Sequence, residues 1–337
     1  MTWTAISTQK ETPAIVRGGW LDALRFIVAS LIILHHFQAA GPVALAEDVH
    51  PMFERGGFLL TNFFLIDSGY VLMRVYGAAL GRGALSPGDF VLKRLLRVWP
   101  AHLIMGLTLV AMVVLGTAVG VAPRSPEWFQ WDQLPAQLGL VQAFGIPGGL
   151  GWNAPTWSIS ALIGCYLAFP WVLRGLTRLG PWSILALGLG GYLLANQLCW
   201  ALLDYPVYQM PLRYGFFRAL PLFVLGMALA GFAQKVWIDP RLARWAGIAA
   251  AVGLFAIQMV DKQALASLAC ISVIILAAGA LPTPRPSKWV GLRLRLPFRD
   301  RQSDPDPYPR LAQVAVTASG APGWPGGVAG RLGTWRR

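Results

Sequence analysis

An arginine and a histidine lie eleven residues apart in the apolar stretch LDALRFIVASLIILHHF, residues 21–37. In an α-helix that turns about 100° per residue, His36 falls within about 20° of Arg25 and roughly 16 Å farther along the axis. His35 lies about 80° from this face, and Asp22 precedes Arg25 by three residues, where the two can pair. A neutral imidazole can take a proton from an attacking hydroxyl near neutral pH. The stretch therefore combines a cation with a candidate general base on one face of a helix.

A purely structural role for these residues stays open. Arg25 can extend its side chain toward the lipid headgroups, and His36 can end the helix at the opposite interface. Titratable side chains inside a membrane usually face a cavity or a neighbouring helix, and this tendency favours the functional interpretation.

A second basic site lies in FVLKRLLRVWPAH, residues 90–102. Arg94 and Arg97 are spaced i, i+3 on a predicted short helix, and Lys93 lies beside them. Guanidinium groups bind phosphate through paired hydrogen bonds, so the site is suited to a phosphorylated ligand. The alternative is a positively charged anchor at the cytoplasmic boundary of the membrane.

The stretch GWNAPTWSISALIGCYLAFP, residues 151–170, places polar side chains at the outer mouth of a predicted span and within it. Its two serines point to different sides of the helix. Hydrogen bonding between helices explains such serines as well as catalysis does. The polar candidates here are Asn153, Ser158, Ser160 and Tyr166.

Membrane helices must position these residues. The chain has 337 residues, of which 55% are hydrophobic and 13% charged, whereas soluble domains have about 25% charged residues. We therefore expect an all-α polytopic integral membrane protein, and the first apolar run lacks the small-residue cleavage site of a signal peptide. Eight spans are predicted, over residues 20–40, 58–76, 101–121, 155–173, 182–203, 214–233, 243–260 and 264–281.

The net charge of +13 is distributed unevenly along the chain. Basic residues gather in alternate loops, which predicts a cytoplasmic-membrane protein with both chain ends in the cytoplasm and with loops 41–57 and 122–153 outside. Because topology explains most of the basic charge, no nucleic-acid partner is expected. The three cysteines lie singly within apolar runs, so neither a disulfide framework nor a metal site is expected.

The motifs in residues 20–290 resemble those of the acyltransferase-3 family, membrane-bound O-acyltransferases that modify bacterial surface glycans. Arg25-x10-His36 is similar to the family's arginine–histidine motif, and Arg94-x-x-Arg97 to the motif before its third span. FFLIDSGYVL (63–72), PTWSISALIGCYLAFP (155–170) and RALPLFVLGMALA (218–230) resemble three further segments in the family's order.

The resemblance implies a reaction in which an acyl group, commonly acetyl, moves from acyl-CoA to a hydroxyl of a carbohydrate or glycolipid. His36 would act as general base or acyl relay, with Arg25 holding the donor or the developing charge. Arg94 and Arg97, with Lys93, would bind the CoA phosphates from the cytoplasm. Asn153, Ser158, Ser160 and Tyr166 would serve the acceptor or support the site. No metal is implied.

Two features depart from the family pattern. Leu162 stands where the family usually has an acidic residue after its Trp-Ser-x-Ser segment. The family also normally has ten spans, and here a tail rich in Pro, Gly and Arg, residues 291–337, follows the SKWVG stretch in place of the last two.

We interpret this tail as disordered and as the product of a shifted reading frame. Losing two spans would expose surfaces meant for helix packing to lipid. We therefore expect weak or no activity from this chain and activity from a frame-restored one, and the nucleotide sequence around codons 288–295 tests this.

Two other functions stay open at this point. One is transport of a small molecule or a lipid-linked sugar, with the charged stripe lining its path, although paired broken helices typical of transporters are not evident in the sequence. The other is an inactive, truncated acyltransferase homologue.

Overall fold

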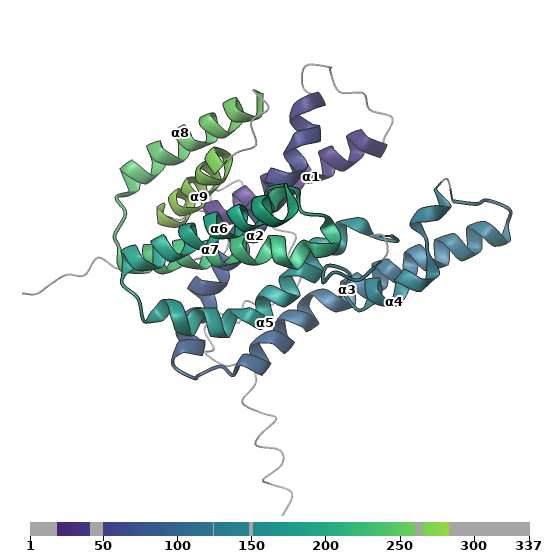
Figure 1. Ribbon diagram of the computed structural model, residues 1–337, viewed down its shortest axis with the longest axis horizontal. Coiled ribbons are helices and arrows are strands. Elements are labelled where there is room, and N and C mark those ends of the chain that lie inside the picture. Colours follow the sequence, from purple (N-terminus) through teal and green to yellow (C-terminus); the bar gives the residue numbers. More distant parts are fainter. Residues whose placement is uncertain (1–18, 41–49, 124, 148–150, 260–264, 283–337) are drawn as a thin grey trace, which may run out of the picture. The chain divides into compact units, whose positions relative to one another are not determined.

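The computed structural model describes residues 19–40, 50–123, 125–147, 151–259 and 265–282. These residues form no β-strand and nine α-helices, joined by loops and short 3₁₀ turns (Figure 1). The predicted cytoplasmic segment, residues 1–19, lies outside the described residues except for Gly19, and the predicted disordered tail, 291–337, lies outside them entirely. The helices are α1 (Trp20–Ala40), α2 (His50–Gly81), α3 (Pro87–Ala118), α4 (Leu134–Leu138), α5 (Trp157–Thr177), α6 (Pro181–Leu203), α7 (Gly215–Lys235), α8 (Pro240–Met259) and α9 (Leu265–Ala280).

Six stretches within the described residues are helical, long and apolar enough to cross a membrane. They lie in α2, α3, α5, α6, α7 and α8, and each overlaps one of the predicted spans. The other two predicted spans correspond to α1, with 21 residues, and α9, with 16. The fold is therefore an all-α polytopic membrane fold, as predicted, while the total of eight spans stays a prediction.

Helix α3 is longer than the sequence pattern predicts. The expected short helix carrying Arg94 and the span starting near residue 101 form one helix of 32 residues that continues through Pro100. Its start is well defined, because Pro87 occupies the first turn and the Ser86 hydroxyl accepts a hydrogen bond from the Asp89 amide over 3.0 Å. Arg94 and Arg97 therefore lie on the same continuous helix as the predicted span that follows them.

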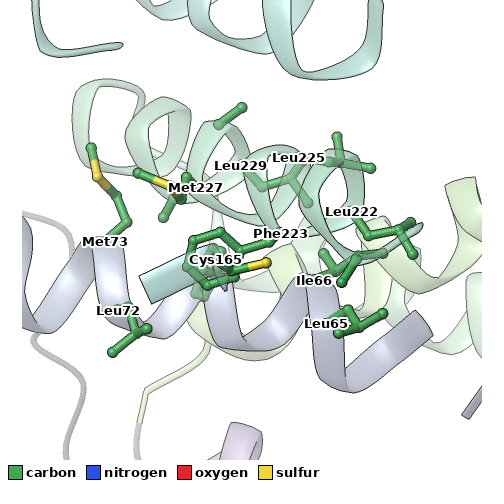
Figure 2. Close-up of a cluster of buried hydrophobic side chains, with 14 of the residues drawn as sticks. Leu65, Ile66, Leu72, Met73, Cys165, Leu222, Phe223, Leu225, Met227 and Leu229 are labelled. Carbon is green, nitrogen blue, oxygen red and sulfur yellow. The ribbon is translucent and has the colours of Figure 1, made fainter. Parts of the chain in front are cut away.

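Helices α2 and α7 pack side by side at the centre of the described residues (Figure 1). A Cβ atom on Gly69 would overlap the carbonyl oxygen of Phe223, and one on Gly226 would overlap that of Ile66. Small residues at these two positions let the helix backbones touch, as in many membrane helix pairs. Figure 2 shows the buried side chains that surround this contact, with Cys165 contributed by α5.

Other helices pack around this pair. Helices α5 and α6 pack against α7, α1 packs against α2, and α8 pairs with α9. Helix α7 is buried along most of its length, from Gly215 to Ala233. The arrangement brings the start of α5 and the start of α7 next to residues 61–65 of α2, where several of the predicted site residues lie.

The predicted outer loop 122–153 contains an ordered segment that ties three helices together. His102 of α3 is hydrogen-bonded through Nε2 to the Gln137 carbonyl oxygen over 2.8 Å. The Phe216 amide of α7 donates to the Ala143 carbonyl oxygen over 3.0 Å. This segment thereby covers the middle of α3 and the starts of α5 and α7.

Candidate active site

A pocket of about 370 Å³ opens where α1, α2, α5 and α7 come together. Its wall combines apolar groups with several side chains capable of chemistry. The latter are His35, His36, Ser158 and Arg218, and Trp157 and Leu162 lie beside them. The pocket thus brings together residues of two predicted site stretches: His35 and His36 of 21–37, and Ser158 of 151–170.

Both histidines of α1 line this pocket. Their ring centroids are 5.3 Å apart with an edge-on arrangement, His36 being exposed and His35 half-buried. Either imidazole could therefore accept a proton from a hydroxyl bound in the cavity. The prediction that His36 alone carries the chemistry rests on helix phase and stays a prediction.

Arg25 is held by two carboxylates and is not among the residues that line the pocket. Its Nη1 donates to Asp22 over 3.1 Å, which confirms the predicted pairing within α1. Its Nε donates to Oδ2 of Asp67 on α2 over 2.6 Å. Asp67 is buried, and an ion pair offsets the cost of placing both charges among apolar helices.

The partnership of Arg25 with Asp67 was not predicted, because the two residues are 42 positions apart in sequence. A carboxylate inside the apolar FFLIDSG stretch was the available signal.

Arg218 is fully buried in the first turn of α7 and contributes to the pocket wall. Its Nη2 donates to Oδ1 of Asn62 on α2 over 3.1 Å. The guanidinium carbon lies 5.1 Å from the ring centroid of Trp157 on α5, in a cation–π contact. Arg218 entered the sequence analysis only as the first residue of the family-like segment 218–230 and was assigned no role. The structure instead holds it between three helices.

The two serines of α5 have different environments. Ser158 lines the pocket, and its hydroxyl donates to the Pro155 carbonyl oxygen over 3.2 Å. Ser160 is fully buried, donates to the Leu140 carbonyl oxygen over 2.7 Å and accepts from the Ala143 amide over 3.2 Å. Ser160 therefore anchors the segment between α3 and α5 and is not among the pocket's lining residues.

Asn153 and Tyr166 are also not among the pocket's lining residues. The Asn153 carbonyl oxygen accepts hydrogen bonds from the amide and the hydroxyl of Thr156, at 3.1 and 2.7 Å, and so shapes the turn before α5. Tyr166 packs edge-on against Phe90 and Phe223, each with a ring-centroid distance of 6.4 Å.

The basic group of α3 is separate from the lining of this pocket. The guanidinium of Arg94 stacks on Tyr76 of α2, with its carbon 4.5 Å from the ring centroid, whereas Arg97 and Lys93 are exposed. Stacking on an aromatic face fixes the plane of a guanidinium while leaving its N–H groups able to bind.

A second hollow, of about 590 Å³, lies at the other end of α5. The turn between α2 and α3 and the last residues of α5, among them Arg174 and Arg178, form its wall. The pocket with the histidines is lined by the start of α5, and this hollow by its end, so the two open toward opposite ends of the same helix.

Among the described residues, no group of three or more His, Cys, Asp or Glu side chains is placed to hold a metal ion. The cysteines in this part of the chain are all free thiols.

Comparison with known proteins gives two matches. A family model described as "Acyltransferase domain" matches residues 19–292. The curated acyltransferase MdmB of Streptomyces mycarofaciens is 29% identical over 164 residues, which cover 47% of this chain and 40% of that protein. The chain thus spans less than half the length of this relative. No solved structure matches the chain.

Proposed function

The chain belongs to the acyltransferase-3 family, and from this premise we propose that it transfers an acyl group, most simply acetyl, from acyl-CoA to a hydroxyl of a carbohydrate or glycolipid. The observation that carries the proposal is the pocket that holds two imidazoles, a serine and a buried guanidinium within a polytopic membrane domain. Acyl transfer to an alcohol needs a proton acceptor and a group that stabilises negative charge, and the pocket offers both.

In the proposed reaction the acceptor hydroxyl attacks the thioester carbonyl carbon while the His36 imidazole takes its proton. A C–O bond forms, the tetrahedral intermediate collapses, and the C–S bond breaks. The imidazolium then returns the proton to the departing CoA thiolate, which leaves the enzyme unchanged.

The donor would bind through its phosphates to the basic group of α3. Arg97 and Lys93 are exposed, and Arg94 is oriented by its stacking on Tyr76. On the proposed topology this group faces the cytoplasm, where acyl-CoA is available, and the histidines lie toward the outer end of α1. The acyl chain and its carrier would then reach from one side of the membrane domain toward the other.

The test is labelled acyl-CoA turnover in membrane vesicles that contain the full chain, with radioactivity followed into carbohydrate and lipid fractions. We expect label in one of these fractions above that in vesicles without the chain. Uptake of labelled sugar by the same vesicles without acyl transfer would contradict the proposal and favour a transporter. Neither transfer nor uptake would identify an inactive homologue.

A further inference from the structure

Arg218 lines the pocket and begins the family-like segment 218–230, but the reaction implied by the family resemblance gives it no role. We propose that its guanidinium is a catalytic group that hydrogen-bonds to the acyl carbonyl oxygen and stabilises the negative charge formed there during transfer. The inference rests on the acyl transfer proposed above and names a residue outside the Arg25–His36 and Arg94–Arg97 pairs.

The first support is the free-energy cost of burying a charged side chain at this position. Arg218 has no exposed surface although it lies in a helix whose other residues are mainly apolar. An arginine inside a membrane protein is expensive to bury and usually marks a functional site. Among the described residues that line the pocket, Arg218 is the only arginine or lysine.

The second support is orientation. Asn62 of α2 accepts a hydrogen bond from Nη2, and Trp157 of α5 lies under the guanidinium plane. Two helices therefore fix the group before any substrate arrives. A fixed cation in a site shielded from water stabilises developing charge with little reorganisation, which is the physical basis of oxyanion stabilisation.

The third support is that the two histidines of α1 line the same pocket as Arg218. A carbonyl group bound in this pocket would therefore have both a proton acceptor and a cation among the residues around it. When the acceptor oxygen bonds to the carbonyl carbon, the π electrons of C=O move to oxygen. The guanidinium stabilises this oxyanion, and the charge returns to re-form C=O as the thiolate leaves.

Arg218 could instead serve only to join α7 to α2 and α5, because its contacts reach both helices. A structural role of this kind predicts loss of stability in parallel with loss of activity. A catalytic role predicts a loss of kcat in a protein that still folds and binds donor. The two are therefore separable by measurement.

The experiment measures kcat and KM for acetyl-CoA, together with the melting temperature in detergent, for the full chain and for Arg218→Gln and Arg218→Lys. Arg213→Gln is the matched control, because Arg213 lies just before α7, is exposed and stacks on Tyr214. Radiolabelled donor makes slow turnover measurable.

We expect Arg218→Gln to lower kcat by roughly 10²–10³-fold, the usual effect of removing one oxyanion donor. The KM should stay within about threefold, and lysine should restore part of the rate because it keeps the charge without the planar fork. A further variant, Arg218→Ala, leaves space for a free guanidinium ion, which should raise its rate when added. The control Arg213→Gln should behave like the unchanged chain.

A folded Arg218→Gln protein with a kcat within about fivefold of the unchanged chain would overturn the inference and leave the proposed function intact. If kcat and the melting temperature both fall in every Arg218 variant, and guanidinium does not restore the rate, the inference is overturned in favour of the structural role. Absence of transfer by the unchanged chain would overturn both the proposed function and this inference.

Discussion

Two arginines that the structure places among the membrane helices have specific neighbours. Arg25 is paired with Asp67 and Asp22, and Arg218 is hydrogen-bonded to Asn62. Buried charges are tolerated when hydrogen bonds and opposite charges replace the water that they lose. The histidines differ, because they face a cavity, where a substrate can reach them.

At the same scale, the donor proposal predicts the effect of changing Arg97. Loss of one charge-assisted hydrogen bond costs about 1.5–3 kcal/mol, so Arg97→Ala should raise the apparent KM for acyl-CoA at least tenfold. Lysine should rescue only in part, since it lacks the bidentate fork. Steady-state kinetics in membranes measures both.

The control for this prediction is Arg82→Ala, which removes an exposed arginine after α2 without touching α3. It should leave the KM unchanged. If Arg97→Ala and Arg94→Ala also keep the donor affinity of the unchanged chain, these residues are topology anchors.

The residue scale also shows how far a sequence can locate a site. Helix phase correctly paired Asp22 with Arg25, because both lie on one helix with known geometry. It could not link Arg25 to Asp67, since that contact depends on how α1 packs on α2. The different environments of Ser158 and Ser160 likewise depend on tertiary packing, because Ser160 is hydrogen-bonded to Leu140 in the segment before α5 whereas Ser158 lines the pocket.

At the scale of the elements, the contact between α2 and α7 organises the described helices. Gly69 and Gly226 come from two motifs that the sequence analysis matched to a family, and the structure shows why no side chain fits there. Without a hydrophobic driving force between helices in lipid, close backbone packing supplies much of their attraction. These glycines therefore affect the site indirectly, by allowing close packing of α2 and α7, two of the helices that line the pocket.

Replacing Gly226 with valine should disrupt this contact. The added side chain would meet the Ile66 carbonyl and the Tyr70 amide of α2, so the helices would have to separate. We expect a loss of about 1–3 kcal/mol, as for overpacked cores, seen as a lower melting temperature in detergent. Gly190→Val, on a face of α6 where a Cβ meets nothing within 4 Å, is the matched control. Equal melting temperatures for the two variants would contradict the packing account.

The positions of the elements were largely predictable. Apolar runs of about 20 residues must match the bilayer thickness, and the six candidate spans overlap those predicted. The continuity of α3 through Pro100 was missed, because proline usually indicates a helix boundary. The packing of residues 126–147 against the middle of α3 and the starts of α5 and α7 was also missed, since it depends on contacts between separate elements.

At the scale of the whole molecule, two hollows open toward opposite ends of α5. With the proposed topology, the hollow with Arg174 and Arg178 faces the cytoplasm and the pocket with the histidines lies toward the outside. Such an arrangement suits an enzyme whose donor and acceptor are found on different sides of a membrane.

Cysteine labelling tests this orientation. Ala46→Cys and Ser125→Cys, made in a chain whose Cys270 is replaced by serine, should react with an impermeant maleimide in intact cells because the loops that carry them are predicted to face outward. Cys165 and Cys199 are buried and should not react with the maleimide. Labelling only after the membrane is broken would reverse the assigned orientation.

The central claim is that acyl transfer takes place in the pocket lined by the α1 histidines, and one comparison tests it most directly. Transfer from labelled acyl-CoA is measured for the full chain, His36→Ala and His35→Ala, with expression levels matched by immunoblot. The account predicts that His36→Ala abolishes transfer while His35→Ala keeps most of it, because His36 shares the face of Arg25 and is the more exposed ring. Normal transfer by His36→Ala and by the double variant would contradict it.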